Sequence, residues 1–127
     1  MKNFTKFIVL LLITFSFKAI SEEVNLYSAR KEHLIKPLTD NFTEKTGIKV
    51  NIITAKAPQL HQRIIREGKN SQADVLLTTD AGNLWKASSE NLFQEINSNF
   101  LLSRIPKKYR DINNEWFGLS LRARIIV

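Results

Sequence analysis

Strand-like and helix-like segments alternate along the chain, and this alternation is the feature that most restricts its fold. Residues 24–27 and 48–54 alternate apolar and polar side chains, as strands with one buried face do. Residues 73–80 have a continuous apolar centre, which is typical of a strand covered on both faces. With a helix after each strand and short connections, the pattern predicts an α/β fold in which helices cover both faces of a parallel sheet.

Turn residues mark the ends of the expected helices. A helix is expected over residues 32–46, with Gly47 as its C-terminal stop. Its apolar residues are Leu34, Leu38 and Phe42 at four-residue spacing, with Ile35 beside them. A second helix should begin at Pro58 and end at Gly68, because proline is tolerated in a first turn and glycine favours a C-terminal cap. Its apolar stripe is Leu60, Ile64 and Ile65. Further helical segments are expected around 84–93 and 100–105, and an extended segment over 115–127.

The first 21 residues have the order of regions found in a secretory signal peptide. A short basic start with Lys2 and Lys6 precedes an apolar run, and Ala19 and Ser21 provide small residues at the spacing of a cleavage site. The run is shorter than the roughly 20 apolar residues that a membrane-spanning helix needs. We therefore expect export to the periplasm, with an uncleaved membrane anchor as the alternative.

Export changes the interpretation of charge. A chain that begins at Glu22 has 16 basic residues against 12 acidic ones, a net charge of +4 in place of +7. No stripe of Lys and Arg with interleaved aromatic residues is visible, so nucleic-acid binding is not expected. The sequence has no cysteine, which excludes disulfides and thiolate metal sites and leaves a packed core as the source of stability.

Candidate ligand-binding residues lie in the loops that follow the strands. Ligands of open parallel sheets bind beyond the carboxyl ends of the strands, so loops 28–32, 54–57 and 78–82 are the expected positions. Arg30 stands before a helix N-terminus, where an anion can receive a guanidinium fork and backbone amides; a salt bridge is the alternative. The neighbouring Glu32 and His33 are candidate metal ligands, with a dipole-stabilised first turn as the alternative.

Other polar residues have less specific patterns. Arg122 and Arg124 alternate along a strand-like run and so share a face, where they need either acids or an anionic ligand; Asp74 and Asp80 are possible partners. Tyr27 is expected in the core and His61 on the solvated surface of a helix. No phosphate-binding glycine loop or hydrolase motif is present, so an enzyme that uses Glu32 and His33 as acid and base is a minor alternative.

The order of several motifs resembles the ferric-iron-binding periplasmic proteins of ABC transporters. The motifs are YSAR in the first loop, TGIKV at the start of the second strand, ADVLLTTD at the third and WFGLSLRAR near the end. The resemblance implies a type II periplasmic-binding lobe from residue 22 to residue 127, the first of two lobes. The chain ends in mid-strand at "RIIV", which also indicates an N-terminal fragment of a longer protein.

The resemblance also implies a function and a ligand set. Such proteins are not enzymes: they capture Fe3+ with a synergistic anion such as carbonate, largely through tyrosine phenolates, and deliver it to a permease in the inner membrane. We expect Arg30, Arg122, Ser28 and Thr79 to serve the anion, the main tyrosine ligands to lie beyond Val127, and the protein to be a monomer. Some relatives have His-Tyr where this chain has Lys31 and Glu32. A binding protein for another anion or metal complex and an inactive fragment are the alternatives.

Overall fold

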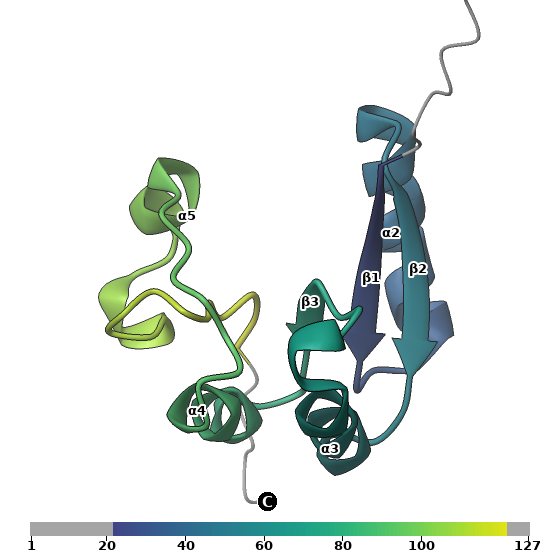
Figure 1. Ribbon diagram of the computed structural model, residues 1–127. Helices are drawn as coiled ribbons and strands as arrows, with labels where there is room; N and C mark the ends of the chain where they lie inside the picture. The colour runs from purple at the N-terminus through teal and green to yellow at the C-terminus, as the bar shows by residue number, and fades with distance from the viewer. Residues whose placement is uncertain (1–21, 122–127) are drawn as a thin grey trace, which may run out of the picture.

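A computed structural model of the protein describes residues 22–121 (Figure 1). The predicted signal peptide and the pair Arg122 and Arg124 therefore lie outside the described residues. The elements are β1 (Glu23–Ser28), α2 (Glu32–Thr46), β2 (Lys49–Thr54), α3 (Ala57–Glu67), the 3₁₀ turn η1 (Gly68–Asn70), β3 (Val75–Leu77), α4 (Ala81–Ser89), α5 (Asn99–Arg104) and the 3₁₀ turn η2 (Lys107–Tyr109).

The three strands form one parallel sheet in the order β2-β1-β3. Figure 1 shows α2 behind the strands and α3 near their carboxyl ends. Tyr27 of β1 pairs with Ile53 of β2 and with Leu76 of β3, so these three residues lie on the same face of the sheet. The expected α/β architecture with a parallel sheet is thus confirmed.

The core lies between that face and α3. Tyr27, Leu60 and Ile64 are buried in one cluster, against which Ile53 and Leu76 pack. Leu60 and Ile64 are separated by one helical turn, so both project from the same side of α3. Ile65, which was expected in this stripe, is 40% exposed.

Helix α2 has the predicted bounds but buries a different face. Gly47 adopts φ 74° and its N–H donates to the Thr43 carbonyl, the predicted glycine stop. Of the expected apolar residues, Leu34, Leu38 and Phe42 are exposed, whereas Ile35 is buried together with Thr39. Each residue turns about 100° around a helix axis. The side that packs on the sheet is therefore displaced by one residue from the side that the four-residue spacing indicates.

Strand β3 is shorter than predicted because its end is used to start the next helix. The expected strand over 73–80 is reduced to Val75–Leu77. Val75 is 48% exposed, so the prediction that the strand is covered on both faces is wrong at this residue. Asp80 is the N-cap of α4, where its carboxylate accepts a hydrogen bond from the Asn83 N–H at 3.0 Å. Residues 78–80 thereby become a loop at the carboxyl edge of the sheet.

The last described segment folds back on itself through a close backbone contact. Arg110 and Phe117 form an antiparallel bridge, and the Gly118 N–H donates to the Tyr109 carbonyl at 2.7 Å. A β-carbon on Gly118 would lie 2.9 Å from the same carbonyl oxygen, so only glycine permits this approach. The contact fixes the positions of Trp116 and Phe117. Within residues 22–121, none of the helices is both long enough and apolar enough to span a bilayer.

Candidate functional site

The three loops at the carboxyl edge of the sheet are connected by backbone hydrogen bonds. The Ala29 N–H donates to the Leu77 carbonyl at 2.8 Å, and the Ala55 N–H donates to the Ser28 carbonyl at 3.3 Å. The ends of β1, β2 and β3 are therefore held at one rim, as expected for a sheet that binds ligands there.

Ser28 shapes the first loop. Its side chain is fully buried, and its hydroxyl accepts a hydrogen bond from the Arg30 N–H at 3.1 Å and donates to the Arg30 carbonyl at 3.2 Å. The hydroxyl thus acts both as a donor and as an acceptor within the turn. The predicted role of Ser28 in anion binding stays a prediction, and the geometry favours an indirect one, in which Ser28 orients the backbone of Arg30.

Arg30 is half-buried at this rim and lines the pocket described below. Among residues 22–121 its guanidinium makes no hydrogen bond or ion pair, so the salt bridge considered from the sequence is not formed there. Helix α2 begins two residues later, and the N–H groups of its first turn have no partners within the helix. A guanidinium and a helix N-terminus are therefore close in the chain, which suits an anion.

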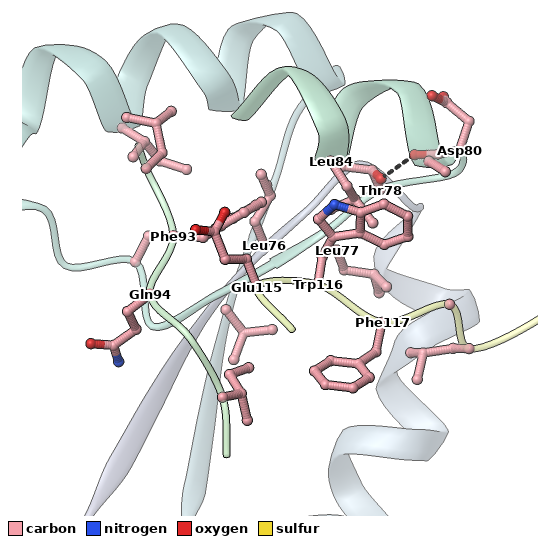
Figure 2. Close-up of a pocket in the computed structure, with 18 of the residues that line it drawn as sticks. Leu76, Leu77, Thr78, Asp80, Leu84, Phe93, Gln94, Glu115, Trp116 and Phe117 are labelled. Carbon is pink, nitrogen blue, oxygen red and sulfur yellow. Dashed lines mark hydrogen bonds between the residues drawn. The ribbon is translucent and has the colours of Figure 1, made fainter. Parts of the chain in front are cut away.

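A pocket of about 1570 Å³ lies beside β3 and α4. In Figure 2, Leu76 and Leu77 come from β3 and Leu84 from α4, whereas Trp116 and Phe117 come from the last described segment. Arg30, Thr78, Thr79 and Asp80 contribute the polar part near the strand ends; Ser28, Glu32 and His33 do not line the pocket. The pocket thus combines an apolar wall with polar and charged side chains, which also include Lys69, Asp74, Glu90, Arg104 and Lys108.

The third loop carries an acidic residue as well as the predicted Thr79. The Thr78 hydroxyl donates to the Asp80 carbonyl at 2.7 Å, as Figure 2 shows. The Asp80 carboxylate accepts hydrogen bonds from the backbone N–H and from the side-chain amide of Asn83. The hydroxyl of the exposed Thr79 lies 3.5 Å from the same carboxylate. Thr79 therefore lines the pocket beside a negative charge, which makes it a weaker anion partner than Arg30. Its role in anion binding stays a prediction.

The predicted metal ligands are not brought together with other donors. Glu32 and His33 are exposed at the start of α2. No group of three or more His, Cys, Asp or Glu side chains suited to a metal occurs among the described residues. The roles of Glu32 and His33 stay predictions, as does that of Arg122, which lies outside the described part. The suggested partners of Arg122 are already engaged, since Asp74 accepts from Asn25 and Asp80 caps α4.

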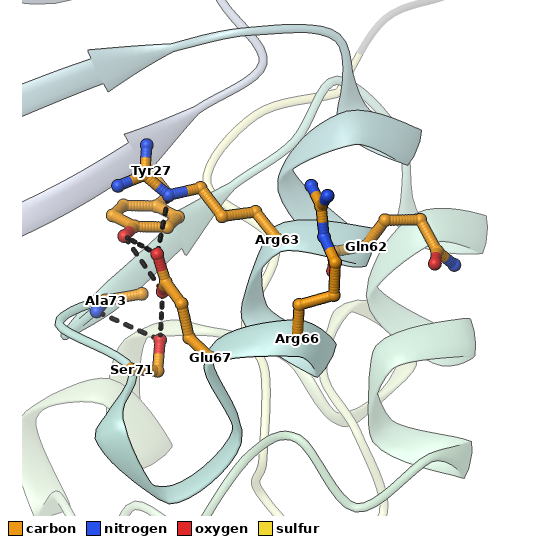
Figure 3. Close-up of polar contacts among 7 residues, drawn as sticks. All are labelled: Tyr27, Gln62, Arg63, Arg66, Glu67, Ser71 and Ala73. Carbon is orange, nitrogen blue, oxygen red and sulfur yellow. Dashed lines mark hydrogen bonds and ion pairs between the residues drawn. The ribbon is translucent and has the colours of Figure 1, made fainter.

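Sequence reasoning missed a polar network around Tyr27, although it correctly placed Tyr27 in the core (Figure 3). The Tyr27 hydroxyl donates to the Glu67 carboxylate at 3.0 Å, and Ser71 donates to the same group at 2.9 Å. Arg63 donates to Glu67 at 2.6 Å, and its guanidinium lies 4.9 Å from the centre of the Tyr27 ring. The signal was the four-residue spacing of Arg63, Glu67 and Ser71.

This network keeps Tyr27 a neutral phenol. Burial raises the pKa of Tyr27, and the hydrogen bond to Glu67 raises it further. A phenol that is buried and donates to a carboxylate is not available as a phenolate ligand. Tyr27 is thus a structural residue of the core.

Acidification should weaken the fold through Glu67. The hydrogen bond from Arg63 lowers the pKa of Glu67, with further lowering from Ser71 and Tyr27. A carboxylate whose folded-state pKa is depressed stabilises the fold above its unfolded pKa, and this contribution is lost as the pH falls through the folded pKa. We expect the Glu67→Gln variant to be less stable than wild type at neutral pH and to lose less stability between about pH 5 and pH 2.

Urea unfolding across this pH range measures the effect, and Glu44→Gln, at an exposed position of α2, is the matched control. Parallel pH profiles of wild type and Glu67→Gln would contradict the assignment.

His61 is buried, contrary to the surface position expected from its sequence context. It is 6% exposed, and its Nε2 lies 3.0 Å from a carboxylate oxygen of Glu90, the residue that follows α4. Its sequence neighbours did not decide its environment, because Leu60 is buried in the core and Gln62 is exposed. The contact joins α3 to α4 beside the pocket.

Known proteins share this chain's sequence and fold. No protein-family model matches the chain. Iron uptake protein A1 of Synechocystis sp. is 45% identical over 106 residues, which are 84% of this chain and 29% of the relative. The Fe(3+)-binding periplasmic protein of Serratia marcescens is 29% identical over 119 residues, 92% of this chain and 35% of the relative. The chain is therefore similar in sequence to one part of ferric-iron-binding proteins.

A solved structure supports the fold assignment. The FutA protein of Trichodesmium in complex with iron and citrate ligands is 46% identical, with a TM-score of 0.72 over 76% of this chain and 30% of that one. This likeness confirms that the chain has the fold of part of one lobe of a ferric-iron-binding protein. The chain spans between 29% and 35% of the length of these three relatives.

Proposed function

We propose that the chain is the first-lobe part of a periplasmic substrate-binding protein that captures ferric iron for an ABC transporter. In this proposal the lobe supplies the anion side of the binding cleft and catalyses no reaction. Residues 1–21 act as the signal peptide, and residues 22–127 belong to the lobe. The binding protein is a monomer that delivers iron to a permease in the inner membrane.

The observation that carries the proposal is the position of Arg30. Arg30 is half-buried at the carboxyl edge of the sheet, without an acidic partner among residues 22–121, two residues before the first turn of α2. A partly desolvated cation of this kind is stabilised by an anion. The Trichodesmium relative was solved with iron and citrate, which supports an anion that accompanies iron.

The donors that bind iron directly are expected from another part of a longer polypeptide. Fe3+ is a hard cation that prefers oxygen ligands such as phenolates and carboxylates. Tyr27 is committed to Glu67, and the described residues contain no cluster of three acidic or histidine donors. The relatives are about three times as long as this chain, which leaves ample sequence for those ligands.

Titration with ferric iron tests the proposal. The complete protein should develop a phenolate-to-iron charge-transfer absorption when Fe3+ is added with bicarbonate or citrate, whereas residues 22–127 alone should not. The comparison of the two polypeptides separates anion binding from metal ligation. A complete protein that remains colourless and retains no iron would refute the ferric function.

A second candidate is a binding protein for a small carboxylate or carbonate anion without iron. It is favoured by the free guanidinium of Arg30 in the described part of the chain and by the lack of clustered metal donors there. Calorimetric titration of the metal-free protein with citrate distinguishes the two functions, because this alternative requires the same affinity with and without Fe3+.

A further inference from the structure

The contact between His61 and Glu90 lies where α4 ends and one wall of the pocket begins. Glu90, Asn91, Leu92 and Phe93 all line the pocket. Ala87, one turn before Glu90 along α4, is fully buried, and the Leu92 N–H donates back to its carbonyl at 3.1 Å. The position of this wall therefore depends on how the end of α4 is held.

The imidazole of His61 has a single charged neighbour among the described residues. Its Nε2 is buried and lies 3.0 Å from Oε2 of Glu90, yet no hydrogen bond with favourable geometry joins them in this part of the chain. The residues three and four positions away on α3 carry no charge; they are Ala57, Pro58, Ile64 and Ile65. Within this part of the chain the Glu90 carboxylate is thus the one ion-pair partner of the buried imidazole.

Other ionisable groups on α3 and α4 have other partners or are exposed. Arg63 and Glu67 of α3 pair with each other over Tyr27. Glu115 accepts a hydrogen bond from Ser88, and Lys86 is exposed one turn before Glu90; neither forms an ion pair with His61 within residues 22–121. Glu90 is therefore the group that responds to the charge of His61.

We propose that His61 and Glu90 form a protonation-dependent clasp that positions the pocket wall 90–94 against α3. Protonated His61 attracts the Glu90 carboxylate and holds the end of α4, whereas the neutral ring does not. His61 and Glu90 are positioning residues, and the inference holds for whichever ligand the pocket takes.

A double-mutant cycle tests the clasp. The cycle measures urea unfolding of wild type, His61→Gln, Glu90→Gln and the double variant, and it gives the coupling between the two side chains. It is carried out at about pH 5 and at about pH 8, which lie on either side of ordinary histidine titration. At the acidic pH we expect the coupling to lower the unfolding equilibrium constant by about two- to fivefold. At the alkaline pH the coupling should have almost no effect on this constant.

The control pair is Lys36 and Asp40, an ion pair at 2.8 Å without a histidine. Its coupling, measured with Lys36→Gln and Asp40→Asn, should not change between the two pH values. Equal coupling of His61 and Glu90 at both pH values, or none at either, would overturn the proposal.

Amide hydrogen exchange gives a second measurement, which uses the wild-type protein and so does not depend on whether a variant folds. In the wild-type protein the amides of residues 91–94 should be more protected at the acidic pH, after correction for the intrinsic exchange rate. Protection that is independent of pH would overturn the clasp. Neither measurement involves iron or an anion, so failure of the clasp is distinct from failure of the ferric function.

Discussion

Replacement of Arg30 by alanine should weaken iron retention in the complete protein by about 10- to 100-fold, with the largest effect when the anion is scarce. The expected factor corresponds to the loss of charge-assisted hydrogen bonds, each worth about 1.5–3 kcal/mol. At saturating bicarbonate or citrate, mass action should compensate part of the loss. Iron release to a competing chelator, measured over a range of anion concentrations, shows both effects.

Two further variants separate the geometry of Arg30 from its charge. Arg30→Lys keeps the positive charge but loses the planar fork, so iron retention should be intermediate. Arg66→Ala removes an exposed arginine on α3 whose Nε donates to the Gln62 carbonyl, and this control should retain iron like wild type. Unchanged iron retention in Arg30→Ala at low bicarbonate would contradict an anion-binding role. Arg122→Ala is expected to act in the same direction as Arg30→Ala.

Replacement of Leu60 by alanine should reduce the free energy of unfolding by about 2–5 kcal/mol. Leu60 is 1% exposed and packs with Tyr27 and Ile64 at the centre of the cluster between α3 and the sheet. Truncation removes buried apolar surface and leaves a cavity, because the strands and the helix cannot collapse into the space. A loss of this size is a large part of the total stability of a small domain.

Chemical unfolding measures this loss, and Leu38→Ala is the matched control. Leu38 belongs to the neighbouring helix α2 and is 64% exposed, so the same truncation there should change stability by less than about 0.5 kcal/mol. Similar losses at Leu60 and Leu38 would show that α3 does not pack on the sheet as described.

The parts of the fold that follow from local chemistry were predictable. Gly47 and Gly68 both have positive φ at the ends of α2 and α3, and Pro58 lies in the first turn of α3. These residues act through the conformations of their own backbone, so neighbouring elements do not change their effect. The strand order also agrees with the α/β class that the alternation predicts.

The parts that depend on contacts between distant residues were not predictable. The four-residue spacing of Leu34, Leu38 and Phe42 indicates a helix, but which side of α2 meets the sheet is set by its angle of packing. His61 is buried because α4 returns beside α3, and Glu90 lies 29 positions further along the chain. A periodic pattern contains no information of that kind.

The candidate site was predictable to the level of loops. The first and third loops do reach one pocket, through Arg30 and through Thr78 to Asp80, because parallel strands end at the same edge. The role of Ser28 in the turn was not predictable, since it depends on how the backbone at Arg30 bends back onto the hydroxyl.

The exposed stripe on α2 has a practical consequence for handling the polypeptide. Leu34, Leu38 and Phe42 are between 40% and 64% exposed on successive turns of one helix, which gives a continuous apolar band in contact with water. Bands of this kind promote self-association. We expect the isolated chain to aggregate as its concentration rises, and light scattering of a Leu38→Lys variant should show a higher solubility limit with little change in the unfolding midpoint.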